Sequence, residues 1–122
     1  MTILVVDDDR DQRELRSLLL ARNGFEALPA ADKISAKRLA ATHHPQAAVV
    51  DLGLPTIQDG LELIRDLKTL NAAIRVVVLT GSPQKVLANN LDFAAVDDLF
   101  VKPASTTALI RKLRSYESSA RD

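Results

Sequence analysis

Acidic side chains follow two short apolar runs of this 122-residue sequence. Asp7 and Asp8 come directly after Ile3–Val6, and Asp51 comes directly after Ala47–Val50. If the two runs form neighbouring strands, the three carboxylates lie close together and repel one another unless a cation lies between them. Oxygen donors without a nearby His or Cys favour Mg²⁺, which commonly bridges one or two carboxylates to a phosphate. The sequence therefore predicts a magnesium site at these two strand ends.

Two further polar side chains follow apolar runs in the second half of the sequence. Thr80 follows Ile74–Leu79, and Lys102, the only basic residue that we expect at this site, follows Leu99–Val101. Carboxylates, Mg²⁺, a lysine and a threonine hydroxyl are the groups used in phosphoryl transfer, where catalysis consists of positioning and charge stabilisation. One carboxylate can then act as a nucleophile and form an aspartyl phosphate.

Five short apolar runs, rich in Val and Ile, are the candidate strands. They are Ile3–Val6, Glu26–Ala30, Ala47–Val50, Ile74–Leu79 and Leu99–Val101. Near-continuous apolar runs are typical of strands buried on both faces of a parallel sheet. Pro29 cannot donate a hydrogen bond to a neighbouring strand, so the second run is expected at a sheet edge. The pattern predicts a three-layer, doubly wound α/β fold with parallel strand order 2-1-3-4-5, whose ligands bind at the carboxyl ends of strands one and three.

Segments of helical period separate these runs. In the first segment, Leu15, Leu18, Leu19 and Arg22 share one face of an amphipathic helix, and Gly24 follows as its C-terminal cap. The other four helices are marked by Ala36, Leu39 and Ala40; by Leu63, Ile64, Leu67 and Leu70; by Val86, Leu87 and Leu91; and by Leu109, Ile110, Leu113 and Tyr116. The sequence therefore contains five consecutive strand–helix units.

Polar residues are expected to begin several of these helices, because their side chains accept hydrogen bonds from the first free amides. They are Asp9, Asp32, Ser82 followed by Pro83, and Ser105 or Thr106. Asp9 is therefore interpreted as a helix cap or first-turn acid rather than a metal ligand. Asp97 and Asp98 are interpreted as turn residues before the last strand.

The composition excludes several classes of function. Sixteen Lys and Arg residues balance sixteen Asp and Glu residues, so the broad basic surface needed to bind nucleic acid is missing. The absence of Cys excludes disulfides, thiol chemistry and zinc ribbons. No apolar run is long enough to span a membrane and no secretory signal begins the chain, so we expect a cytoplasmic protein. Residues 1–122 are expected to form one domain, with a core at 2–117 and a polar tail at 118–122.

Four ordered motifs resemble those of the receiver domain of two-component response regulators, including its chemotaxis-regulator-like members. They are VVDDD at residues 5–9, VVDLGLPTIQDGLEL at 49–63, VVVLTG at 76–81 and LFVKPAS at 99–105. The spacing between them is similar to that of the family, and the resemblance extends over residues 2–117. It implies a flavodoxin-like (βα)5 fold and a role in phosphorelay signal transduction.

The resemblance also implies roles for individual residues. Asp51 would accept a phosphoryl group from the phosphohistidine of a sensor histidine kinase or a histidine phosphotransfer protein. Asp8, Asp51 and the backbone carbonyl of Gly53 would bind Mg²⁺, and Asp7 would orient a metal-bound water. Lys102 would hold a phosphoryl oxygen.

A second group of residues would respond to phosphorylation in such a domain. Thr80 would move to hydrogen-bond the phosphorylated aspartate, Gly81 would leave room for the phosphoryl group, and Ser82 would flank it or serve only as a helix cap. The Lys102–Pro103 peptide bond would be cis, as proline permits. Receiver domains usually carry an aromatic residue at the position of Leu99, so the usual coupling between the threonine and this ring is expected to differ here.

The partner surface is expected on the face formed by helix four, strand five and helix five, which would bind a downstream effector or a second copy. The chain would catalyse only its own phosphorylation and dephosphorylation, and its output is expected to lie outside this chain. Neither nucleic acid nor membrane is an expected partner.

Other functions remain open at this point. A degenerate receiver would act as an interaction module without phosphorylation. A haloacid-dehalogenase-like phosphatase would use Asp7 as its nucleophile, with Asp9 in a D-x-D motif, but it needs an acidic pair after the lysine, where only Glu117 and Asp122 remain. A flavodoxin-like FMN carrier would need a Ser/Thr/Gly phosphate loop in place of the acidic cluster.

Overall fold

The computed structural model describes residues 1–53, 56–88 and 94–119, in which strands and helices alternate. The strands are β1 (Thr2–Val6), β2 (Glu26–Ala30), β3 (Ala47–Asp51), β4 (Arg75–Thr80) and β5 (Asp98–Val101). The helices are α1 (Arg10–Arg22), α2 (Lys33–His43), α3 (Ile57–Leu70), α4 (Pro83–Ala88) and α5 (Thr106–Ser119). The strands pair in parallel in the order β2-β1-β3-β4-β5, with the Pro29 strand at an edge. The predicted fold and strand order are confirmed.

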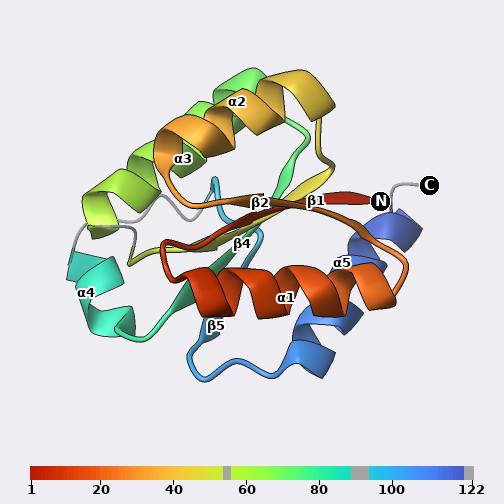
Figure 1. Cartoon of the computed structure of the whole chain (residues 1–122). Coiled ribbons are helices and arrows are strands. Elements are labelled where there is room, and N and C mark those ends of the chain that lie inside the picture. The colour runs from red at the N-terminus through yellow and green to blue at the C-terminus, as the bar shows by residue number, and fades with distance from the viewer. Residues whose placement is uncertain (54–55, 89–93, 120–122) are drawn as a thin grey trace.

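Helices cover both faces of the sheet and give three layers, with α2 and α3 on one face and α1 and α5 on the other (Figure 1). Successive residues of β1 contribute to opposite faces. Leu4 and Val6 join the core beneath α2 and α3, whereas Ile3 and Val5 join the core beneath α1 and α5. Because both faces are buried, residues Ile3–Val6 of β1 form an uninterrupted apolar run.

Side chains begin four of the helices by accepting backbone N–H groups. The acceptor and donor pairs are Asp9 and Gln12 at 3.0 Å, Asp32 and Ser35 at 2.7 Å, Thr56 and Asp59 at 3.2 Å, and Ser105 and Ala108 at 3.2 Å. Asp9, Asp32 and Ser105 are the residues that the sequence predicted. The sequence analysis missed Thr56, although Thr is a common N-cap residue and Asp59 stands in the first turn.

The end of α1 is a Schellman motif built on Gly24, whose φ is 89°. The N–H of Gly24 donates to Ala21 O at 3.2 Å, and the N–H of Phe25 donates to Leu20 O at 3.1 Å. Only the left-handed backbone conformation that Gly adopts without strain closes this pair of bonds. The chain therefore turns sharply from α1 into β2.

The amphipathic spacing located α1 but misidentified its inner face. Leu15 is 57% exposed and Leu18 is 50% exposed, whereas Leu20 is fully buried. The inner face also carries Arg16, whose side chain is only 16% exposed and reaches the Asp7 carboxylate. A leucine in place of Arg16 would leave the buried Asp7 Oδ2 without its cationic partner, and a buried charge needs such a partner.

The ends of two other helices differ from the predicted pattern. Leu70, expected on the inner face of α3, is 52% exposed at its last residue. α5 continues to Ser119, so residues 118 and 119 of the predicted tail are helical. Leu91, expected in helix four, lies outside the described residues. Within residues 1–53, 56–88 and 94–119, no helix has the length and apolar character needed to cross a membrane.

Candidate functional site

Parallel pairing brings the acidic strand ends of β1 and β3 together. Val6 pairs with Val50, so Asp7 and Asp51 are neighbours one residue further along. Both are buried, at 0% and 6% exposed. The carboxyl edge of the sheet therefore holds two carboxylates largely removed from water.

The other two strand ends complete this edge. Thr80 pairs with Val101, and the N–H of Lys102 donates to the carbonyl oxygen of Thr80 at 2.7 Å. Thr80 is buried, at 4% exposed, and its Oγ1 accepts the N–H of Ser82 at 3.0 Å. The structure thus gathers Asp7, Asp51, Thr80 and Lys102, as the sequence predicted for this edge.

Asp51 is held through both of its carboxylate oxygens. Oδ1 accepts the N–H of Gly53 at 2.9 Å, and Oδ2 accepts a hydrogen bond from Lys102 Nζ within an ion pair. A Cβ at Gly53 would lie 3.3 Å from Asp51 Oδ1, so the tight turn leaves little space for a side chain there. The carboxylate is therefore fixed in direction, and one oxygen faces a lysine that is itself 29% exposed.

Asp7 is engaged differently, mainly by α1 and its N-terminal turn. Oδ1 accepts the N–H of Asp9 at 2.9 Å, and Oδ2 accepts Arg16 NH1 at 3.0 Å. Arg13 NH1 donates to the Asp7 carbonyl oxygen at 2.9 Å. Lys102 is therefore not the only basic residue near the acidic cluster, and that expectation is wrong. Both arginines were missed because their role depends on the direction of α1 relative to β1.

The pKa of the Asp7 carboxyl is raised above its ordinary value of 3.8, and burial is the largest cause. The negative charge of Asp51 also raises it. The Asp9 amide and the Arg16 guanidinium act in the opposite direction, because both stabilise the charged form. Burial and mutual repulsion thus disfavour the charged carboxylates at this site, and a bound cation would reduce that repulsion.

The donor set at this edge fits Mg²⁺. Asp8 and Gly53 are exposed at the ends of β1 and β3, and Asp51 is buried, so two carboxylates and a backbone carbonyl belong to the neighbouring ends of these two strands. In the described parts of the chain no group of three or more His, Cys, Asp or Glu side chains is arranged to hold a metal ion. Mg²⁺ does not require such a cage, because it keeps several waters and takes one or two carboxylates.

The remaining predicted site residues lie around this edge. A Cβ built on Gly81 would meet no atom within 4 Å, so open space lies beside Thr80. Ser82 precedes α4, and its carbonyl oxygen accepts the N–H groups of Lys85 and Val86. Leu99 packs against the core beneath α2 and α3, whereas Phe100 packs on the opposite face. The Lys102–Pro103 peptide bond is cis.

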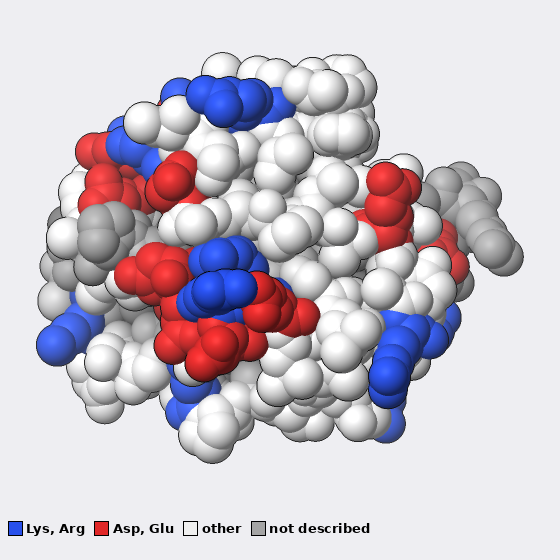
Figure 2. Space-filling view, viewed as in Figure 1, with Lys and Arg blue, Asp and Glu red and all other residues white. Residues whose placement is uncertain are grey.

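A groove of about 460 Å³ runs beside the site, between α1 and the start of α5. Its walls are Gln12, Leu15, Arg16 and Leu19 on one side and Lys102, Pro103, Ala104 and Thr106 on the other. Figure 2 shows charged side chains gathered over the start of α1, with an uncharged area beside them. The exposed Leu15 of α1 thus lies in the same groove as Lys102.

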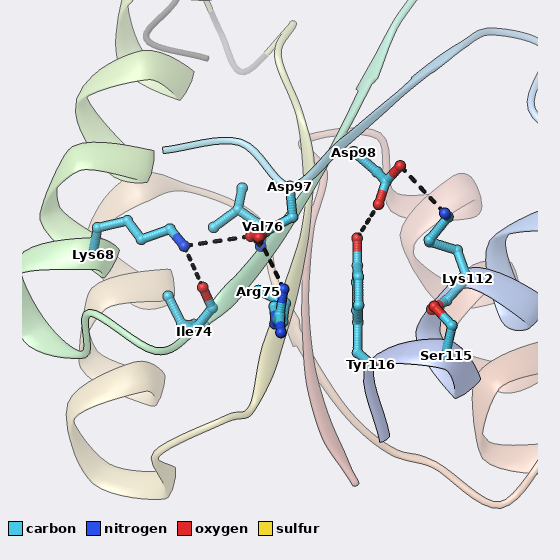
Figure 3. Close-up of polar contacts among 9 residues, drawn as sticks. All are labelled: Lys68, Ile74, Arg75, Val76, Asp97, Asp98, Lys112, Ser115 and Tyr116. Atoms are coloured by element: carbon cyan, nitrogen blue, oxygen red, sulfur yellow. Dashed lines mark hydrogen bonds and ion pairs between the residues drawn. The ribbon is translucent and has the colours of Figure 1, made fainter. Parts of the chain in front are cut away.

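A second acidic pair lies at the opposite, amino end of β4 and β5 (Figure 3). Asp97 accepts the N–H of Val76 at 2.7 Å and also contacts Lys68 at 3.3 Å and Arg75 at 3.4 Å. Asp98 is the first residue of β5, so the interpretation of both residues as turn residues is wrong for Asp98.

Asp98 connects β5 to α5. It accepts the Tyr116 hydroxyl and lies 3.5 Å from Lys112 (Figure 3). Burial and this hydrogen bond raise the pKa of Tyr116, so the phenol stays protonated and donates. The sequence offered no signal for these contacts, because the partners lie 14 or more positions away.

Comparison with known proteins places this architecture in a family. Residues 3–114 match the family model of the response regulator receiver domain. The chain is 37% identical over 115 residues to Response regulator MprA of Mycobacterium sp. (strain KMS), and 36% identical over 117 residues to Response regulator MprA of Mycobacterium leprae (strain TN). These alignments cover 93% and 94% of this chain but 49% and 50% of the relatives, so the chain spans about half their length.

Solved structures share the fold. A response regulator receiver domain protein from Clostridium thermocellum superposes with a TM-score of 0.85 at 19% identity, covering 98% of this chain and 96% of that one. The response regulator TrrA from Thermotoga maritima, solved in complex with Mg(2+)-BeF, superposes with a TM-score of 0.81 at 24% identity, covering 94% and 97%. Since the family match extends over nearly the whole described chain, the protein belongs to the response regulator receiver domain family of two-component systems.

Proposed function

We propose that Asp51 accepts a phosphoryl group, in a Mg²⁺-dependent reaction, from the phosphohistidine of a sensor histidine kinase or a histidine phosphotransfer protein. The observation that carries this proposal is the buried Asp51 carboxylate, fixed by the Gly53 amide and paired with Lys102 at the meeting point of four strand ends. A carboxylate oxygen attacks phosphorus, the O–P bond forms and the P–N bond breaks. The leaving imidazole takes up a proton, and an acyl phosphate remains on the aspartate.

Asp8, Asp51 and the Gly53 carbonyl would hold the Mg²⁺, and Asp7 would orient one of its waters. When bound, the ion neutralises charge on the phosphoryl oxygens. Lys102 already contacts Asp51 Oδ2, and its partial exposure leaves it free to follow the charge from the carboxylate to a phosphoryl oxygen. Lys102 would thus stabilise the phosphoryl oxygens without a further cationic side chain entering the site.

Thr80 and the segment after it would carry the response. Its Oγ1 accepts the Ser82 amide in the structure, so rotation of Thr80 toward a phosphoryl oxygen would break that bond and shift the start of α4. A local change of charge would thus alter the face formed by α4, β5 and α5. That face would bind a downstream effector or a second copy, with Leu99 transmitting the change without an aromatic ring.

The groove beside the site fits the phosphodonor protein. Leu15 lines it and is 57% exposed, and Leu18 on the same helix is 50% exposed. Exposed leucines next to a polar site favour a protein partner, because a protein surface can bury these leucines and a small polar phosphodonor cannot. The donor would therefore pack on α1 and deliver its phosphohistidine across Lys102. In this proposal residues 2–117 act as one receiver unit that catalyses only its own phosphorylation and dephosphorylation.

Phosphorylation is tested by incubating the protein with Mg²⁺ and acetyl phosphate and measuring intact mass. The wild type is expected to gain one phosphoryl group, and Asp51→Asn is expected to gain none. Wild type without a mass change, and without a response to beryllofluoride, would instead favour a degenerate receiver that acts only by binding.

The same experiment separates Asp51 from the phosphatase alternative. Both oxygens of Asp7 already accept hydrogen bonds, from Asp9 and Arg16, which suits a positioning carboxylate better than a nucleophile. Borohydride reduction and peptide mapping are expected to locate the acyl phosphate on Asp51. A label on Asp7 would overturn the assignment.

A further inference from the structure

Arg16 places a largely buried positive charge against the acidic site. Its NH1 lies 3.0 Å from Asp7 Oδ2, and the two side chains are only 16% and 0% exposed. Arg13, one turn earlier on α1, donates instead to the Asp7 backbone carbonyl. Arg16 is thus the α1 residue whose charge acts directly on an Asp7 carboxylate oxygen.

This ion pair differs from the ones on the surface of the molecule. Exposed pairs such as Arg10 and Glu14 are screened by water and contribute little. A buried pair keeps most of its Coulomb interaction with neighbouring charges, and the charge that next approaches Asp7 in the proposed reaction is Mg²⁺. Arg16 therefore repels the same ion that the carboxylates attract.

We infer that Arg16 is a positioning residue that holds Asp7 in direction and, as a resident counter-cation, weakens the binding of Mg²⁺ at the carboxyl edge of the sheet. The inference rests on the proposed function, since it concerns the metal that this function requires. Its consequence is a site that loads with Mg²⁺ less tightly than its carboxylates alone would allow. Asp7 nevertheless stays ordered without metal, because Arg16 and the Asp9 amide hold both of its oxygens.

The test is the Mg²⁺ dissociation constant of the whole chain, measured by isothermal titration calorimetry without a phosphodonor. Arg16→Gln removes the charge and is expected to bind Mg²⁺ at least about threefold more tightly than wild type. Arg16→Lys keeps the charge and is expected to restore the wild-type constant within about twofold. Arg22→Gln, at the far end of α1, removes an equal charge from an exposed position and is expected to change nothing.

A second pair of variants guards against misfolding of Arg16→Gln. Asp7→Asn is compared with the double variant Asp7→Asn/Arg16→Gln, in which no buried charge is left without a partner. The double variant is expected to bind Mg²⁺ more tightly than Asp7→Asn alone. Thermal unfolding of each variant establishes that it is folded before titration.

The outcomes separate the inference from the function on which it rests. If Arg16→Gln binds Mg²⁺ equally or more weakly, or if Arg16→Lys gains as much affinity as Arg16→Gln, the counter-cation role is wrong. If the wild type itself neither binds Mg²⁺ nor forms an acyl phosphate, the proposed function is wrong, whatever the variants do.

Discussion

The two ends of the same sheet use carboxylates in different ways. At the carboxyl edge, Asp7 and Asp51 are buried, with side chains 0% and 8% exposed, and their cationic partners are Arg16 and Lys102. At the amino edge, Asp97 and Asp98 are more accessible, with side chains 21% and 28% exposed. Residue types are similar at both ends, so composition does not distinguish them.

The partners of each carboxylate make the difference. Asp97 ties β4 to α3 through the Val76 amide and Lys68, and Asp98 ties β5 to α5 through the Tyr116 hydroxyl. Such bonds join elements that cannot move apart without loss of structure. Asp51 instead pairs with the ammonium group of Lys102, a point charge on a long side chain that can exchange one anionic partner for another. Replaceable partners suit a reacting group, and irreplaceable partners suit a structural one.

The largest expected contrast lies between the lysines of the two ends. Lys102→Met is expected to slow phosphorylation by acetyl phosphate by about 100-fold, because a preorganised charge at the reacting oxygens is lost. Lys68→Met is the matched control and is expected to leave the rate unchanged. Rates of mass gain at saturating Mg²⁺ measure both, and a similar decrease in the two variants would remove the distinction between the ends.

Stability is expected to show the reverse pattern. Asp97→Ala leaves the Val76 amide without its acceptor and is expected to lower the free energy of unfolding by about 2 kcal/mol. Asp51→Asn relieves repulsion with Asp7 and is expected to leave this free energy unchanged or to raise it. Urea denaturation compares the two variants. If the free energy of unfolding falls more in Asp51→Asn than in Asp97→Ala, the carboxylate at the carboxyl edge also stabilises the fold.

Adjacent residues of the first loop sharpen the comparison within the carboxyl edge. Asp8→Ala is expected to weaken Mg²⁺ binding roughly tenfold or more, because the proposed site loses one of its carboxylate ligands. Asp9→Ala removes the cap on Gln12 and is expected to cost about 1 kcal/mol of stability with little change in Mg²⁺ affinity. Calorimetric titration and urea denaturation are performed on both. Equal Mg²⁺ affinities would contradict this division of roles.

The smallest expected effect concerns how stability depends on pH: the contributions of Asp7 and Asp32 are expected to change with pH in opposite directions. Burial raises the pKa of Asp7 above 3.8, so its contribution to stability is present below 3.8 and is lost as the pH rises through the higher folded value. In Mg²⁺-free buffer, the unfolding free energy of Asp7→Asn relative to wild type is therefore expected to rise as the pH rises above 3.8. Unfolding free energies across this range measure it.

Asp32 is the matched case in which backbone hydrogen bonding dominates. The Ser35 amide lowers the pKa of Asp32 below 3.8, so its contribution to stability is present above 3.8 and is lost as the pH falls through the lower folded value. The advantage of wild type over Asp32→Asn is expected to shrink in that range. Parallel pH profiles for the two variants would mean that burial does not dominate at Asp7.

Local patterns were enough to predict most of the sheet and the core of the site. The run Glu26–Ala30 is β2 with unchanged bounds, and Pro29 placed it at the edge. Asp51, Thr80 and Lys102 follow their strands directly, so strand order alone brings them to one edge. These features depend on backbone hydrogen bonding and burial on both faces, which are readable within a few residues.

Only the tertiary structure decided which distant residues pair with each carboxylate. Helical spacing located α1, but its rotation about its own axis turned Leu15 and Leu18 outward and Arg16 toward Asp7. Asp97 and Asp98 took partners on α3, β4 and α5 for the same reason. The sequence by itself determined the elements, their order and the polar groups at the strand ends. The packing of helices against the sheet decided the charges around those groups, because long side chains reach partners that no spacing in the sequence specifies.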